Sequence, residues 1–351
     1  MSVRENFLYA MRRKGSSYIP FEFILCPSLL AEFRQRTGME DYAEYYGFPT
    51  RLLFVDYIGG SEKFHKYYKS VEGIFINDWG IGFKQGDTVD FNRMIHPMKD
   101  FELLSDYEKY PYPNPIKDYD WKSFFQKVQE VKGRDLIAVA YEEVTIFETA
   151  WYLRGMDNFL IDMATGSECA IYLLDQITDR RCTTAGMFAR AGCDVLRLGD
   201  DVSTQLDMMM HPDTWREYIK PRLAKVICAA RSENPGIMIF YHGDGNLQKI
   251  IPDLIEIGVD ILNPVQPECM NPVEIKKLYG DKLSFWGTVG TQTTMPFGSP
   301  DEVRDVCIKM INEVGNGGGL LLAPTHVLEP DVPWENIQAF IDTVREHNKN
   351  N

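Results

Sequence analysis

Short apolar segments alternate with longer amphipathic segments along the second half of the chain. The short segments are rich in β-branched and other apolar residues, and the longer ones repeat apolar residues at helical spacing. This alternation predicts strands joined by helices, and hence a parallel sheet with right-handed crossovers. The predicted strands are residues 195–199, 237–241, 259–265, 283–287 and 319–323, and the predicted helices are residues 213–231, 246–257, 272–279, 300–314 and 333–347.

A doubly wound sheet and a (β/α)8 barrel both satisfy this alternation. Each predicted strand runs directly into a polar turn that contains Gly or Pro. A barrel gathers such turns into one ring above a filled core, where the active sites of barrels lie. The glycine-rich residues 315–319 precede a strand, and no G-x-G-x-x-G segment follows one. The pattern therefore favours an α/β fold of the (β/α)8 TIM barrel type.

The first 130 residues are less regular than the rest of the chain. Residues 51–58, residues 73–83 and the acidic, aromatic stretch up to Trp121 predict an antiparallel, loop-rich elaboration. We predict a single domain over residues 1–351, with a cap-like elaboration over about residues 40–130. The remaining predicted elements are an initial strand at 18–26, a helix at 121–131, a strand at 135–141 and a helical block from about 145 to 191.

Composition and charge narrow the classes of function. Hydrophobic residues make up 44% of the chain, enough for a packed core, so the chain is not predominantly disordered. The 37 Lys and Arg against 51 Asp and Glu give a net charge of −14, which argues against nucleic acid as a partner. We expect no signal peptide and no membrane span, because no apolar segment is long enough. Seven widely spaced cysteines predict reduced thiols in a cytoplasmic protein.

Side chains that bind metals follow several of the predicted strands. His242, Cys269 and His326 come after three of them, and Glu148 follows an earlier one. Imidazole, thiolate and carboxylate are the ligands of tetrahedral Zn²⁺. We therefore predict a metal site of His242, Cys269 and His326, with Glu148 as a fourth candidate. Alternatively, Cys269 is a small buried apolar residue and Glu148 a solvated residue in the first turn of a helix.

Other polar and aromatic residues at strand ends are candidates for catalysis and substrate binding. Asp200 and Asp201 follow one strand; one of them is expected to cap the next helix, and we assign Asp200 to the site. Glu143 is a second candidate for proton transfer. Aromatic residues at such positions are also typical of a core. The candidates for substrate binding are Tyr141, Trp79, Trp286 and Asp244.

Five blocks of sequence, LRLGDDVSTQ, IMIFYHGDG, ILNPVQPECMNP, LSFWGTVGTQ and GGLLLAPTHVLEPDVPWENI, resemble the uroporphyrinogen decarboxylase superfamily. The resemblance covers roughly residues 135–347 and extends weakly to IPFEFILCP and NDWGIGF. It implies a (β/α)8 barrel, in agreement with the pattern of strand ends. The superfamily includes the decarboxylase itself and zinc methyltransferases that work with corrinoid (cobalamin) proteins.

The resemblance also bears on which branch this chain is similar to. The decarboxylase carries an arginine-containing N-terminal segment that binds its acidic tetrapyrrole, whereas this chain has no arginine between Lys14 and Arg34. The branch that methylates a thiol has the zinc motif His-x-Cys with a distant Cys. The matching positions here are His242, Asp244 and His326. Donors richer in nitrogen and oxygen make the metal a harder Lewis acid.

This donor set looks more like the aromatic O-demethylase branch. The resemblance then implies a zinc enzyme that cleaves a methyl ether of a methoxylated aromatic compound and passes the methyl group to Co(I) of a corrinoid protein. Asp200 or Glu143 would give a proton to the departing phenolate. Three alternatives stay open: decarboxylation of a tetrapyrrole, methylation of a thiol, and a non-catalytic scaffold that retains the barrel.

Overall fold

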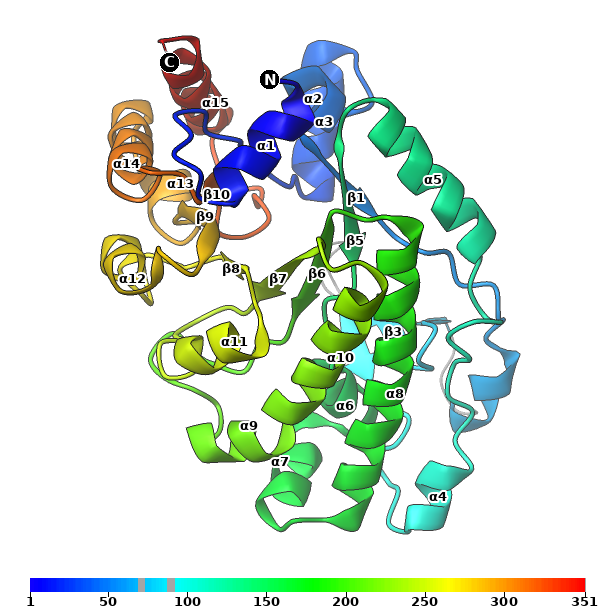
Figure 1. The fold of residues 1–351 in the computed structure, drawn as a ribbon. Helices are drawn as coiled ribbons and strands as arrows, with labels where there is room; N and C mark the ends of the chain where they lie inside the picture. The colour runs from blue at the N-terminus through cyan, green and yellow to red at the C-terminus, as the bar shows by residue number, and fades with distance from the viewer. Residues whose placement is uncertain (69–72, 87–91, 351) are drawn as a thin grey trace.

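A parallel sheet forms the centre of the protein. The computed structural model describes residues 1–68, 73–86 and 92–350. Within these residues, seven parallel strands pair in the order β1-β5-β6-β7-β8-β9-β10. Figure 1 shows that this sheet curls and that the helices lie on its outside. The strands are β1 (Thr50–Leu53), β5 (Ile137–Tyr141), β6 (Val195–Gly199), β7 (Met238–His242), β8 (Ile261–Asn263), β9 (Ser284–Val289) and β10 (Leu320–Pro324).

Most of the helices connect consecutive strands of this sheet, as right-handed crossovers require. The longest of them, α8, packs against α10 beside β6. Among the described residues, no helix combines the length and the hydropathy needed to cross a membrane. The helices are α1 (Val3–Met11), α2 (Pro27–Thr37), α3 (Tyr42–Tyr46), η1 (Glu62–Tyr67), α4 (Leu104–Glu108), α5 (Trp121–Gly133), α6 (Phe147–Arg154), α7 (Met156–Ala164), α8 (Glu168–Ala191), α9 (Pro212–Tyr218), α10 (Lys220–Glu233), α11 (Ile251–Ile257), α12 (Pro272–Tyr279), α13 (Thr294–Phe297), α14 (Pro300–Glu313) and α15 (Trp334–Asn350).

The segment before α2 lies at the free edge of β10. Bridges pair Phe21 with Leu322 and Leu25 with Leu328, both in the parallel sense. The predicted initial strand is therefore present as isolated bridges rather than as a continuous strand. On its other side, the ring of Phe21 contacts that of Phe48 at 5.5 Å, just before β1 begins. The segment thus lies between the two edge strands, in the place of an eighth strand, and gives the sheet a barrel-like form.

Two hydrophobic clusters follow from the alternation of side chains along the strands. One cluster fills the inside of the curled sheet and contains alternate strand residues such as Val139, Val195 and Phe240. Phe7 and Met11 of α1 belong to it too, so α1 closes the end of the sheet where the strands begin. The second, larger cluster lies between the strands and the outer helices. The inside is therefore a filled core, and only its other end is available for a site.

One glycine is required where β9 passes the turn after β8. Gly287 has φ +136°, and a Cβ there would lie 2.3 Å from the carbonyl oxygen of Pro264. The amide of Thr288 donates to the same oxygen at 3.0 Å. A side chain at residue 287 would push the two segments apart. This glycine therefore fixes the turn that begins at Pro264 against β9.

A small antiparallel sheet lies outside the main one. It has the order β2 (Ile74–Ile76), β3 (Gly82–Gln85) and β4 (Asn92–Ile95). It agrees with the antiparallel elaboration predicted from residue 73 onward, although residues 69–72 and 87–91 of that region lie outside the described residues. The prediction for residues 51–58 was wrong in part, because β1 pairs in parallel with β5 in the main sheet. The short apolar run of β1 gave no signal of its partner.

Candidate functional site

Inward-facing residues at the carboxyl ends of the strands line a cavity of about 420 Å³. We call it the metal-side cavity. These positions continue the alternation that builds the inner core: His242 follows Phe240 by two residues, and Asn263 follows Ile261 by two. The inward positions at the carboxyl ends of the strands thus form a ring above the apolar core. The inward residues of this ring are Tyr141, Arg197, His242, Asn263 and Trp286.

The imidazole of His242 is fixed by its neighbour on β8. Its Nδ1 lies 2.5 Å from Oδ1 of Asn263, and Nδ2 of Asn263 donates to the carbonyl oxygen of Trp286 at 2.6 Å. Because the Asn263 amide is oriented by the second bond, its oxygen faces the ring and accepts the proton of Nδ1. Nε2 of His242 then keeps a free lone pair, which is the state of a metal-binding histidine.

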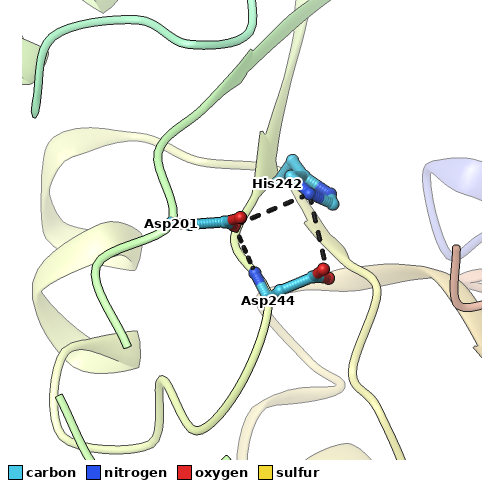
Figure 2. A group of neighbouring side chains, drawn as sticks. All are labelled: Asp201, His242 and Asp244. Atoms are coloured by element: carbon cyan, nitrogen blue, oxygen red, sulfur yellow. Dashed lines mark hydrogen bonds and ion pairs between the residues drawn. The ribbon is translucent and has the colours of Figure 1, made fainter. Parts of the chain in front are cut away.

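Two carboxylates face this nitrogen, as Figure 2 shows. Oδ1 of Asp201 lies 3.7 Å from Nε2 of His242, and Oδ1 of Asp244 lies 3.8 Å from it. The backbone amide of Asp244 donates to Oδ1 of Asp201 at 2.8 Å, which holds the two turns together. Among the described residues, this group of three offers ligand atoms within 4.8 Å of one another.

The donor chemistry of this group fits a divalent cation. Oδ1 of Asp244 is buried and has no hydrogen-bond partner among the described residues. Three lone-pair donors thus converge where a buried acceptor lacks a partner, and this arrangement costs free energy unless a cation is shared between them. Ligand atoms around one Zn²⁺ at about 2.0–2.2 Å lie roughly 3.4 Å apart, close to the 3.7 Å and 3.8 Å that separate Nε2 of His242 from the two carboxylate oxygens. One imidazole and two carboxylates suit zinc or a harder divalent ion.

The pKa values of these groups reflect the crowding of negative charge. Burial lowers the pKa of His242, but the carboxylates of Glu143, Asp244 and Asp201 outweigh it and the net shift is upward. Burial also raises the pKa of Asp244, against the influence of His242. The site therefore favours an added positive charge, whether it is a proton or a metal ion.

The predicted ligands are only partly brought together. His242 belongs to the cluster, whereas His326 is exposed and lines the same cavity without being part of it. Glu148 lines the cavity too, but its Oε2 accepts the amide of Asp201 at 3.0 Å, so it positions that residue. Cys269 does not line the metal-side cavity, and its thiol lies 3.6 Å from Oε1 of Gln266. Asp244, predicted to bind substrate, is instead in the cluster.

The two aspartates after β6 have the reverse of the predicted arrangement. The side chain of Asp200 is completely buried, and it accepts the amides of Ile146 at 3.0 Å and Glu148 at 3.0 Å. These bonds fasten the start of α6, where backbone amides lack partners within the helix. Asp201 faces the cavity. The structure therefore places Asp200, which was assigned to the site, at a helix start that is remote in sequence and outside the lining of the metal-side cavity.

The other predicted residues lie around two neighbouring cavities. Glu143 forms an ion pair with Arg197, and both side chains are nearly buried. Trp286 donates through Nε1 to Glu22 at 2.9 Å. Trp79 lines a second cavity of about 510 Å³, which we call the sheet-side cavity. The two cavities share the wall residues Phe54, Tyr141, Glu143 and Val144.

Sequence reasoning missed Asn263 and Arg197 and gave Asp201 a capping role. Asn263 is the last residue of its strand and is followed by a proline. Its position at a strand end was therefore a usable signal. Arg197 stands inside an apolar strand, and a charged residue at an inward position is the signal that would have found it. Asp201 had the same sequence signal as Asp200, and only the position of the start of α6 gives the two residues different roles.

Comparisons with known proteins identify the family of this chain. The uroporphyrinogen decarboxylase (URO-D) family model matches residues 82–347. The methylcobamide:CoM methyltransferase MtaA of Methanosarcina barkeri is 29% identical over 169 residues, which are 48% of this chain and 46% of that protein. A uroporphyrinogen decarboxylase of Rickettsia conorii is 25% identical over 278 residues, 76% of each chain.

The solved structures give the same picture of the fold. A methyltransferase from Methanosarcina mazei superposes with a TM-score of 0.72 at 19% identity, covering 99% of both chains. At that identity the similarity concerns the fold alone, and it extends over nearly the whole length of both chains. The match to MtaA spans about half the length of that relative. Since the family model covers most of the sequence, from the small antiparallel sheet to the last helix, the protein belongs to the uroporphyrinogen decarboxylase family.

Proposed function

We propose that this protein is a zinc-dependent methyltransferase that takes a methyl group from a methoxylated aromatic compound and passes it to the Co(I) of a corrinoid protein. The observation that carries the proposal is the group of Asp201, His242 and Asp244, three lone-pair donors with an unpartnered carboxylate oxygen. The similarity to MtaA, a methylcobamide:CoM methyltransferase, supports a corrinoid partner.

Zinc would be held by His242, Asp201 and Asp244. His326 lines the metal-side cavity together with His242 and Asp201 and is a further candidate. Bound there, it would act as a Lewis acid that stabilises negative charge on the oxygen of the departing phenolate. Asn263 keeps the lone pair of His242 directed at this point, and Glu148 holds the backbone of Asp201. Contacts of this kind orient the ligands and thereby raise the affinity of the site for the metal ion.

The rest of the cavity suits an aromatic compound. Tyr141 and Trp286 form apolar walls, and Glu143, held by Arg197, presents a carboxylate beside them. We propose that Glu143 hydrogen-bonds the substrate, and that Asp200 acts by fixing the start of α6. We further propose that the small antiparallel sheet closes over the reacting groups and excludes water, as lids of barrel enzymes do.

Decarboxylation of a tetrapyrrole is less well supported by the cavity. Several relatives are uroporphyrinogen decarboxylases. Among the described residues that line the metal-side cavity, however, Arg197 is the one arginine or lysine, and it is paired with Glu143. Glu22, Glu148 and Asp201 add further acidic groups. A substrate with eight carboxylates would be repelled by such walls and by the net charge of −14.

The test combines metal content with methyl transfer. Protein purified without chelator should hold zinc and transfer a methyl group from methoxylated aromatics only when a reduced corrinoid protein is added. His242→Ala should lose zinc and slow the reaction by about 10²–10³, the effect of removing one electrostatic stabiliser. His65→Ala, in η1 and away from both cavities, is the control.

Each alternative has its own assay. Release of CO₂ from a tetrapyrrole tetra-acetate without metal would replace this proposal by the decarboxylase. Methyl transfer from the corrinoid protein to a thiol, with no reaction of aromatic ethers, would replace it by the thiol branch. Absence of stoichiometric zinc together with inactivity in all three assays would indicate a scaffold.

A further inference from the structure

Helix α6 carries two polar side chains one turn apart, Glu148 and Tyr152, which belong to the walls of different cavities. Glu148 lines the metal-side cavity, whereas Tyr152 lines the sheet-side cavity and does not line the metal-side cavity. Residues four apart on a helix are neighbours on one face. The hydroxyl of Tyr152 donates to Oε1 of Glu148 at 3.1 Å. The two side chains therefore form one hydrogen-bonded unit.

The backbone of both residues is fixed from outside the helix. Near the start of α6, Asp200 accepts the amide of Glu148 at 3.0 Å. Near its end, Nδ1 of His96, the residue after β4, lies 2.8 Å from the carbonyl oxygen of Tyr152. A carbonyl oxygen only accepts, so Nδ1 of His96 carries the proton of this bond. Loss of the Tyr152 hydroxyl should therefore remove its bond to Glu148 and leave the ring in place.

The second oxygen of the Glu148 carboxylate connects this unit to the metal cluster. Oε2 accepts the amide of Asp201 at 3.0 Å, and Oδ1 of Asp201 accepts the amide of Asp244 at 2.8 Å. A series of hydrogen bonds thus joins Tyr152 to two of the three residues of the cluster. Glu148 is buried, and each of its oxygens has one of these donors. Removal of either donor leaves a buried oxygen without its partner, which is unfavourable.

Asp201 depends on this support more than the other members of the cluster do. Its side chain is 36% exposed, against 30% for Asp244 and 15% for His242. An exposed side chain gains little orientation from packing, so the place of the Asp201 carboxylate depends on how firmly its backbone is held. Groups that orient a ligand change the affinity of a site for its metal ion without touching the ion.

We infer that Tyr152 is a positioning residue of the metal site. Its hydroxyl orients the carboxylate of Glu148, and Glu148 in turn holds Asp201 where its side chain faces Nε2 of His242. Because Tyr152 does not line the metal-side cavity, it acts on the site through Glu148. The inference rests on the metal site of the proposed function, but it concerns the binding of the ion and is independent of the methyl donor.

The test is a double-mutant cycle on the zinc affinity of the full chain, measured by competition with a chromophoric chelator. Tyr152→Phe keeps the ring but removes the hydroxyl, and it should weaken zinc binding about tenfold. Glu148→Ala removes the acceptor for the amide of Asp201 and should weaken zinc binding about 10–100-fold. Adding Tyr152→Phe to Glu148→Ala should change the affinity by less than about twofold, because residues that act through one another are not additive.

Tyr119→Phe is the matched control. The hydroxyl of Tyr119 donates to Oδ2 of Asp78 at 2.6 Å, and both residues line the sheet-side cavity without lining the metal-side cavity. This variant removes the same kind of bond from the same cavity, and it should change the zinc affinity by less than about twofold. Thermal unfolding of each variant verifies that it is folded. As a second measurement, Tyr152→Phe should shift the visible absorption of Co²⁺ bound in place of zinc, and Tyr119→Phe should not.

Equal zinc affinities of wild type and Tyr152→Phe would overturn the inference. An equal loss from Tyr152→Phe in the presence and absence of Glu148 would also overturn it, because the hydroxyl would then act by another route. If the cycle gives the expected result but no aromatic ether is demethylated, the inference stands and the proposed function fails. If aromatic ethers are demethylated and Tyr152→Phe binds zinc as wild type does, the proposed function stands and the inference fails. A wild-type protein that binds no zinc would overturn both.

Discussion

His242 and Asn263 are direct partners in the register of β7 and β8, and their side chains form a hydrogen bond of 2.5 Å on the inner side of the sheet. Neighbouring strands thus supply the imidazole that we propose binds a metal ion and the group that fixes its tautomer. The amide of Asn263 is itself anchored to the backbone of Trp286 on β9. Three adjacent strands therefore determine which nitrogen of His242 is free for a metal ion.

Replacing Asn263 should weaken metal binding without removing any ligand. Asn263→Ala removes the acceptor for the Nδ1 proton, and we expect the zinc affinity to fall about 10–100-fold, as for other partners of metal-binding histidines. Competition with a chromophoric chelator measures this. Asn263→Asp keeps an acceptor at the same place and should restore most of the affinity. Equal affinities for wild type and Asn263→Ala would show that the bond does not govern the site.

The two competing ligand sets are separated by Asp244 and Cys269. Asp244→Asn keeps the size of the side chain but removes the charge next to His242, and we expect it to lose stoichiometric zinc. Cys269→Ser should retain zinc, because the thiol faces Gln266 and lies outside the cluster. Atomic absorption on both purified variants decides between them. The opposite outcome would restore the ligand set of His242, Cys269 and His326 predicted from the sequence.

The sequence predicted the elements of the second half well because their signals are local. The helix at 272–279 and the strand at 195–199 have the predicted bounds, and the polar turns after the apolar strands lie at the end of the sheet that carries the metal-side cavity. This rule selected His242, which lines that cavity. Such reasoning works because side chains alternate strictly along a strand, so position within the strand determines which face a residue occupies.

The parts that failed depend on contacts between remote segments. Asp200 and Asp201 have the same local sequence signal, and only the start of α6, more than 50 residues earlier in the chain, assigns one to the helix and the other to the cavity. β1 was placed in the elaboration because four residues do not reveal their partner strand. The direction of the Cys269 side chain depends on the exact course of a turn, which no periodicity predicts.

The distinct roles of the two aspartates give a further prediction. Asp200→Ala leaves the amides of Ile146 and Glu148 without partners in a fully buried place, and we expect the free energy of unfolding to fall by roughly 3 kcal/mol. Asp201→Ala should change it by less than about 1 kcal/mol, since that side chain is partly exposed, but should lose zinc. Urea denaturation and metal analysis of both variants test this. A stable Asp200→Ala protein without zinc would return Asp200 to the site.

Loss of one partner of the Arg197–Glu143 ion pair should destabilise the protein more than loss of both partners. Both side chains are about one-tenth exposed, and Arg197 also lies over the ring of Phe240 at 4.7 Å. Arg197→Met leaves Glu143 as an uncompensated charge above the apolar core, so the free energy of unfolding should fall by about 3–5 kcal/mol. The double variant Arg197→Met with Glu143→Gln removes both charges and should recover a large part of that loss, as measured by urea denaturation.

An exposed pair on the outer surface provides the comparison for this cycle. Lys127 and Asp56 form an ion pair with side chains that are 42% and 61% exposed, and Lys127→Met should cost less than about 1 kcal/mol because water solvates the charge that is left. If Arg197→Met were no more destabilising than Lys127→Met, the carboxylate of Glu143 would have to be solvated in the cavity. Its hydrogen-bonding role toward a substrate would then not require Arg197, and the double variant would lose methyl transfer while Arg197→Met kept it.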